Sequence, residues 1–175
     1  MNIFRSTTAH GFTLIETLIA ILIFTTALVS LMTIAGRGIG ATSSARQQIT
    51  AHYLAQEGLE VVRNIRDSNF NSGNAWDSGF SSCTLSDPCG VVYGNGGTAP
   101  SLGSCSGNCG VAQSNGAFVD AQNGTPSTYQ RFIYAIPSVD AQGTVDGYKV
   151  ISKMYWEFRG VGRELELSTV LKPWR

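Results

Sequence analysis

Four cysteines are the residues of this 175-residue chain best suited to redox or metal chemistry. They are Cys83, Cys89, Cys105 and Cys109, so five residues separate the first two and three residues separate the last two. All-thiolate zinc sites typically use cysteines two residues apart, and that spacing does not occur here. We therefore predict disulfides, and no metal or cofactor, in a segment that lies in an oxidising compartment.

The pairing of these cysteines stays open at the level of sequence, because four cysteines allow three connectivities. We favour Cys83–Cys89 with Cys105–Cys109, since each bond then closes a small local loop. The two other pairings would instead link the two loops to each other by disulfides.

A single carboxylate in a long apolar run is the second chemical feature. Residues Phe12–Ala35 carry one charge, Glu16. As a helix this run would extend about 36 Å, enough to cross a hydrocarbon core of about 30 Å. A buried core helix is disfavoured, because the rest of the chain could not wrap a helix that is apolar on all sides. A secretory signal peptide is disfavoured because the small residue Gly11 precedes the apolar run. We predict a transmembrane helix over residues 12–35.

Glu16 needs a partner in that setting, since an unpaired carboxylate within a membrane costs several kcal/mol. If the chain is cut after Gly11, the new amine of Phe12 is a cation at a similar depth. Within one straight helix that amine lies about 6 Å along the axis from Glu16, which is poor for direct contact. A neighbouring subunit, shifted along the axis, could bring its own amine to Glu16. The alternative is a glutamate that snorkels to the headgroups near the helix end.

Residues His10–Glu16, HGFTLIE, resemble the processing site of type IV pilins and of the pseudopilins of type II secretion systems. In that family a short basic leader ends in glycine, phenylalanine follows, and a glutamate stands fifth after the cut. The resemblance implies that a prepilin peptidase in the membrane cleaves between Gly11 and Phe12 and methylates the Phe12 amine. It also implies that Glu16 pairs with the N-terminus of another pilin subunit. Residues 1–11 are then the leader, and Arg5 without any acidic residue favours a cytoplasmic location for it.

Residues 36–67 are expected to continue the helix in amphipathic form. Three glycines between Gly36 and Gly40 cost a helix about 2–3 kcal/mol, so we consider a hinge or a locally melted turn there alongside an unbroken helix. Beyond them, His52 and Glu57 are expected on a solvated face. The opposite face is predicted to be apolar, from the helical spacing of Ala51, Leu54, Ala55, Gly58, Val61, Val62 and Ile65.

Residues 68–128 are rich in glycine, serine and asparagine, which predicts a disulfide-bearing loop region. No Lys or Arg stands between Arg66 and Arg131. Proteins grip phosphate backbones mainly through such side chains, so we expect no nucleic acid to bind through this region. DNA contact through other faces stays open.

Residues 129–175 are predicted to form an antiparallel β-sheet. Tyr148–Arg159 alternates between apolar and charged side chains, as in a half-buried strand, and a turn at Gly160–Gly162 leads to a second strand, Arg163–Leu171. Tyr129–Ile136 supplies a third strand. This meander can bury one face against the apolar stripe of the helix. The predicted fold is therefore α+β, with a long N-terminal helix that spans the membrane in its first half and packs on the sheet with its second half.

This layout is also similar to that of pilins. The ending Leu165–Arg175, which contains Trp174, resembles the last strand and tail of some minor pilins of the PilV-like and related pseudopilin groups. The chain has 12 Lys and Arg residues and 12 Asp and Glu residues, so its formal net charge is zero. This composition predicts no strongly charged partner. Two histidines, His10 and His52, are too few for a multi-histidine metal site, and no catalytic residue is expected.

The sequence thus predicts a structural protein and not an enzyme. It would be a precursor in the inner membrane, single-pass with its leader in the cytoplasm. The processed form is expected to be assembled into a pilus or to prime it, and we favour a minor pilin. The alternatives are a pseudopilin of a type II secretion system, a DNA-uptake pilin, and a membrane-anchored binding or adhesive domain that never assembles.

Overall fold

A computed structural model describes residues 11–93, 99–105, 109–115, 117–120 and 124–173 of the chain. The predicted leader up to His10 and the tail residues Trp174 and Arg175 lie outside the described residues. The chain divides into two compact units, Met1–Ala45 and Arg46–Arg175, and each is described by itself.

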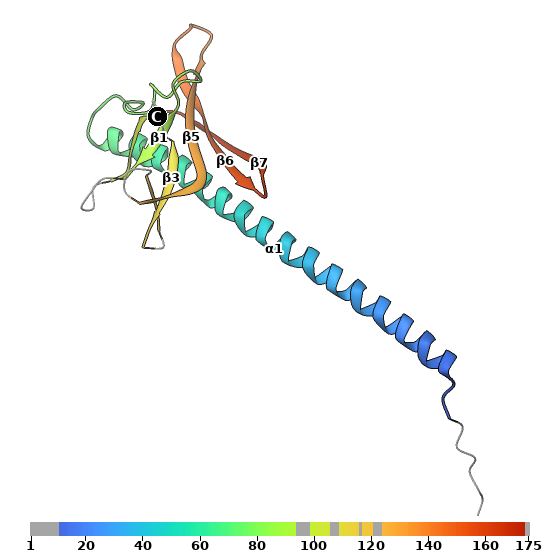
Figure 1. The fold of residues 1–175 in the computed structure, drawn as a ribbon. Helices are drawn as coiled ribbons and strands as arrows, with labels where there is room; N and C mark the ends of the chain where they lie inside the picture. Colours follow the sequence, from blue (N-terminus) through green and yellow to red (C-terminus); the bar gives the residue numbers. More distant parts are fainter. Residues whose placement is uncertain (1–10, 94–98, 106–108, 116, 121–123, 174–175) are drawn as a thin grey trace, which may run out of the picture. The chain divides into compact units, whose positions relative to one another are not determined.

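One helix, α1, runs from Leu14 to Asn71 and supplies secondary structure to both units (Figure 1). It passes unbroken through Gly36, Gly38 and Gly40, so the hinge that the glycines suggested is not observed. No proline interrupts this stretch. Glycine keeps its backbone amide, so it lowers helix stability without removing a hydrogen bond. The helical residues on either side therefore carry α1 across the glycines.

The unit Arg46–Arg175 contains a seven-stranded sheet, and all of its strand pairs are antiparallel. Its centre is β5 (Thr125–Val139), which pairs with β6 (Val145–Phe158), and β6 pairs with β7 (Val161–Leu171). These three strands are the predicted meander, and Figure 1 shows β7 on the outer side of the sheet. Arg159 and Gly160 connect β6 to β7, both with positive φ (54° and 75°), which is the conformation of a tight two-residue hairpin turn.

The segment predicted as a loop region contains more regular structure than its composition suggested. It includes the last turn of α1 and four short strands: β1 (Cys89–Val92), β2 (Ser101–Ser104), β3 (Gly110–Ser114) and β4 (Ala117–Asp120). Both β1 and β3 pair with β5, while β2 and β4 pair with β1 and β3 in turn. The long strand β5 therefore acts as a template that holds segments whose own sequences are weak strand formers.

The core of this unit lies between the apolar stripe of α1 and one face of the sheet. Gly58 marks the closest approach, because a Cβ built there would lie 2.7 Å from Ile133 Cδ1 and 2.8 Å from Ser152 Oγ. Buried residues from both layers fill the space: Ala51, Leu54, Ala55, Leu59, Val61, Val62, Ile133, Val150, Met154 and Trp156. The predicted α+β, pilin-like fold is confirmed, with the second half of the helix packed on an antiparallel sheet.

Candidate processing and assembly site

The bond between Gly11 and Phe12 lies in non-helical chain just before α1. Nothing lies within 4 Å of a Cβ built on Gly11, and Phe12 is 81% exposed. A peptide bond in this setting is accessible to a peptidase. The structure thus places the predicted cleavage residues next to each other in an open segment.

Thr13 caps the helix, a role that our sequence analysis missed. The backbone N–H of Glu16 donates to the Thr13 hydroxyl at 3.3 Å and to the Thr13 carbonyl at 3.1 Å. Thr13-Leu14-Ile15-Glu16 also fits the threonine-x-x-glutamate pattern of a capping box, which was the available signal in the sequence. Thr13 therefore starts the helix two residues after the predicted cut and sets Glu16 in its first turn.

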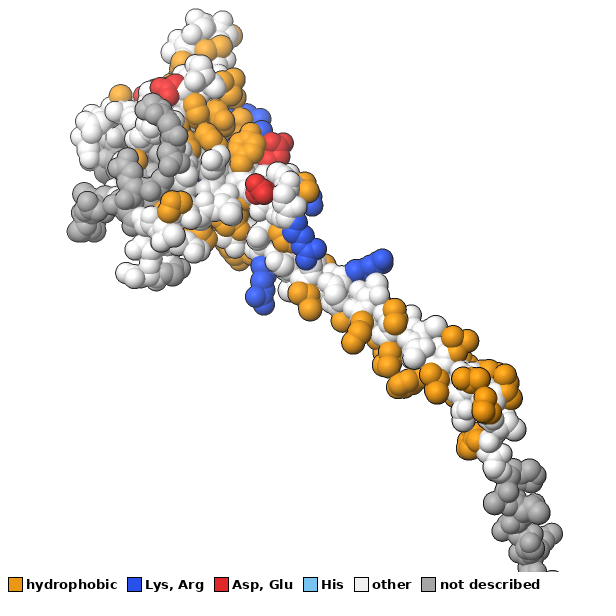
Figure 2. Space-filling view, in the orientation of Figure 1, with side chains coloured by type: hydrophobic (Ala, Val, Ile, Leu, Met, Phe, Trp, Pro, Cys, Tyr) orange, Lys and Arg blue, Asp and Glu red, His pale blue; other side chains and the backbone are white. Residues whose placement is uncertain are grey.

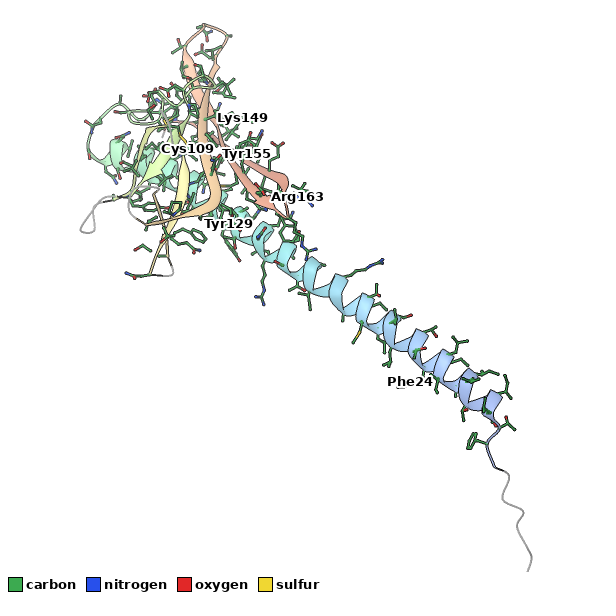
Figure 3. The ribbon with its side chains drawn as sticks, viewed as in Figure 1. Phe24, Cys109, Tyr129, Lys149, Tyr155 and Arg163 are labelled. Atoms are coloured by element: carbon green, nitrogen blue, oxygen red, sulfur yellow. A yellow bond between two sulfur atoms is a disulfide. The ribbon has the colours of Figure 1, made fainter. Side chains whose placement is uncertain are left out.

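The first part of α1 presents apolar side chains to its surroundings on all sides. Figure 2 shows those on one face, along the segment that Phe24 marks in Figure 3. Within the described residues, α1 is the one helix long and apolar enough to cross a membrane, and its most apolar stretch is entirely unburied within the chain. Large side chains that are more than half exposed include Leu14, Ile15, Leu18, Ile21, Leu22, Ile23, Phe24, Val29, Leu31 and Ile34.

The hydroxyl groups of this apolar segment bond to carbonyl oxygens of their own helix. Thr17 donates to Leu14 at 2.8 Å, and Ser30 donates to Thr26 at 2.9 Å. Thr25, Thr26 and Thr33 do the same with carbonyls three or four residues earlier. Lipid therefore imposes little cost on these hydroxyls. Glu16 is left as the one ionisable side chain between Phe12 and Ala35.

The cysteines form two disulfides, Cys83–Cys89 and Cys105–Cys109, with Cα–Cα distances of 5.1 and 5.2 Å. This is the local pairing that we favoured. The first bond lies in the core, where the Cys83 carbonyl accepts a hydrogen bond from the N–H of Ala135 at 2.6 Å. Among the described residues, no cluster of three or more His, Cys, Asp or Glu side chains could hold a metal ion.

A buried charged cluster joins α1, β5 and the end of β1. The Arg131 guanidinium, 2% exposed, donates to Glu57 Oε2 at 2.8 Å, to the Leu54 carbonyl at 2.9 Å and to the Tyr93 hydroxyl at 2.9 Å. Tyr93 in turn donates to the other Glu57 oxygen. Burial raises the pKa of the Tyr93 hydroxyl, and Arg131 offsets part of that shift. The expectation that Glu57 lies on a simply solvated face is therefore wrong, because its carboxylate neutralises a buried arginine that the sequence pattern did not reveal.

Comparison with known proteins gives one family match, at the N-terminal segment. Residues 7–32 match the model described as the prokaryotic N-terminal methylation motif, which is the prepilin motif of type IV pilins. The match includes Gly11, Phe12, Thr13 and Glu16. A search of curated proteins and a search of solved structures each gave no significant match.

The chain therefore carries the prepilin methylation motif at the start of an exposed apolar helix. This motif implies membrane association, processing by prepilin peptidase and assembly with pilins. The pilin family that this motif describes is a structural one. Together with the apolar helix, the motif indicates that the precursor is anchored in the inner membrane.

Proposed function

We propose that this protein is the precursor of a structural pilin subunit, most simply a minor pilin. Prepilin peptidase cleaves it after Gly11 and methylates the new amine of Phe12. The mature subunit is then incorporated into a pilus filament or primes its assembly. The observation that carries the proposal is the methylation motif over residues 7–32. Its single glutamate lies in an apolar helix, and the hydroxyl side chains of that helix donate hydrogen bonds to carbonyl oxygens of the helix itself.

The Glu16 carboxylate recruits the subunit by pairing with the Phe12 amine of a neighbour. Among the described residues, no hydrogen bond or ion pair reaches this carboxylate. A charge that costs several kcal/mol in lipid is stabilised when an opposite charge arrives from another chain. Helix packing around the apolar segments of two subunits then reinforces the contact.

The leader stays on the cytoplasmic side, so the unit Arg46–Arg175 folds outside the cytoplasm. Its two disulfides support this orientation, because such bonds persist in oxidising compartments. In the assembled state the apolar helix forms part of a filament core, and the sheet unit with its disulfide-bearing strands faces outward.

Substitution of Glu16 tests the recruitment step. We expect Glu16→Ala to lower the amount of protein in sheared filaments by about tenfold or more, relative to the membrane fraction, because loss of a charge pair in lipid exceeds 1.4 kcal/mol. Ser30→Ala is the matched control, since the Ser30 hydroxyl bonds only within its own helix. Wild-type incorporation of Glu16→Ala would refute the recruitment role. A wild-type protein that never leaves the membrane fraction and keeps its leader would instead indicate an unassembled membrane anchor.

A further inference from the structure

The strand β7 forms a long and regular free edge of the sheet. It pairs with β6 without a register shift from Val161↔Phe158 to Leu171↔Tyr148, and no other described strand pairs with it. At 11 residues it is far longer than β2 and β4, which have four residues each and end the opposite side of the sheet. A strand edge presents unpaired N–H and C=O groups, and proteins that stay apart usually interrupt such an edge with a bulge or a proline.

A groove runs between this edge and the helix. It has a volume of about 590 Å³ and is bordered by Leu167 and Ser168 of β7 and by Tyr53, Gln56 and Glu60 of α1. Consecutive residues of a strand point to opposite faces, so a groove that touches both Leu167 and Ser168 lies along the backbone edge itself. Arg63 also lines the groove, and its guanidinium donates to the Thr169 hydroxyl at 3.4 Å.

The two faces of β7 differ in chemistry. On the side that packs toward α1, Leu165 and Leu167 are partly buried, and Tyr53 on the helix is 66% exposed beside the groove. On the other side, Glu164 and Glu166 stand two residues apart, opposite Tyr155 and Lys153 of β6. Lys153 bonds Glu164 at 3.2 Å, and among the described residues no ion pair reaches Glu166.

We propose that β7 is a docking edge for an extended segment of another protein in which apolar and basic residues alternate. The segment adds an eighth strand beside β7 through backbone hydrogen bonds. Its apolar side chains lie next to Leu165, Leu167 and Tyr53. Its basic side chains stand beside Glu164 and Glu166, where opposite charges on neighbouring strands attract. This inference does not depend on the proposed role in a filament, because it concerns the sheet unit alone.

The test uses the full chain in neutral detergent and the peptide TVKVKVKVT-amide labelled with fluorescein at its N-terminus, with protein-free micelles as the blank. Anisotropy should show saturable binding, and the same peptide with glutamate for lysine should bind about tenfold more weakly. The double variant Glu164→Lys, Glu166→Lys should reverse this preference. Glu157→Lys is the matched control, because Glu157 is an exposed acid one strand further in, and it should leave the preference unchanged.

A second peptide tests the backbone contact. N-methylation of alternate amides removes the donors along one edge of the peptide, and the two alternating sets should differ: methylation of the edge that meets β7 should abolish binding. Equal binding of both methylated peptides, equal binding to the wild type and the double variant, or no binding at all would overturn the proposal. Self-association that the double variant abolishes would also overturn it, because the occupant of the edge would then be a second copy of this chain.

Discussion

The guanidinium of Arg131 on β5 bonds the Glu57 carboxylate on α1 at 2.8 Å, and this ion pair ties the helix to the middle of the sheet. The arginine is 2% exposed and the glutamate is 37% exposed, so the two partners differ in their access to water. An arginine that loses its counter-charge stays buried, whereas a glutamate that loses its arginine can hydrate.

This asymmetry predicts unequal effects of removing either partner. We expect Glu57→Gln to lower the free energy of unfolding by about 3 kcal/mol, because an uncompensated charge then stays in the core. Arg131→Met should cost less, since it removes the buried charge and leaves a carboxylate that reaches solvent. Urea unfolding of the full chain in detergent, followed by tryptophan fluorescence, measures both. Glu60→Gln, from the exposed Arg63–Glu60 pair, is the control and should change stability by less than about 0.5 kcal/mol. A larger loss for Arg131→Met than for Glu57→Gln would contradict this account.

Two glycines of the same helix should respond in opposite ways to alanine. Gly58→Ala places a methyl group against Ile133 and Ser152, and we expect a net loss of about 1–3 kcal/mol from overpacking. Gly38→Ala meets no atom within 4 Å and should stabilise the helix by about 0.5–1 kcal/mol. Thermal unfolding followed by circular dichroism distinguishes the two. A stabilising Gly58→Ala would show that helix and sheet do not approach as closely as the structure has them.

The disulfide Cys83–Cys89 should matter more for stability than Cys105–Cys109. Both Cys83 and Cys89 are core residues, and Cys83 also bonds β5 through its carbonyl. We expect the double variant Cys83→Ala, Cys89→Ala to lower the free energy of unfolding by about 2–4 kcal/mol, and the corresponding change at Cys105 and Cys109 to cost less.

Iodoacetamide should label none of the four cysteines before reduction. Four labelled thiols in the native protein would disprove both disulfides.

Alkaline pH should weaken the fold. Burial raises the pKa of the Tyr93, Tyr129 and Tyr148 hydroxyls above the ordinary value of 10.0. Above that pH the unfolded chain releases these protons before the native chain does, so the native state binds more protons and stability falls as pH rises. Below it both states are protonated, and these groups contribute no slope. We therefore measure the urea midpoint of unfolding from neutral pH to about pH 12. These tyrosines should leave the midpoint unchanged below about pH 10 and lower it above that pH. Tyrosinate absorbance should show late-titrating groups that appear together with unfolding.

Much of the fold could be predicted because local periodicity matched the final packing. Ala51, Leu54, Ala55 and Val62 recur at helical spacing, and all of them are buried against the sheet. The alternation along Tyr148–Phe158 matches the burial of β6, where Tyr148, Val150, Met154 and Trp156 are buried on one face. In both elements one face is mostly apolar in the sequence, and that face is the one buried in the structure.

The remainder could not be predicted because it depends on contacts between distant segments. The strand β1, with the sequence CGVV, is too short and too rich in glycine to be recognised without its partner β5. Arg131 looked like an ordinary polar position of a strand, and only the fold brings Glu57 and Tyr93 to it. At the processing site, Gly11, Phe12 and Glu16 were predicted through the resemblance to the prepilin motif, whereas the cap at Thr13 was overlooked although its Thr-x-x-Glu pattern is local.

A processed, assembly-competent subunit is identified most directly by the intact mass of the protein extracted from membranes and from sheared filaments. We expect the filament form to lack Met1–Gly11, to begin at Phe12 and to carry the additional mass of one methyl group, with both disulfides intact. A filament form that retains its leader, or a protein found solely in the membrane at its full precursor mass, would contradict the account.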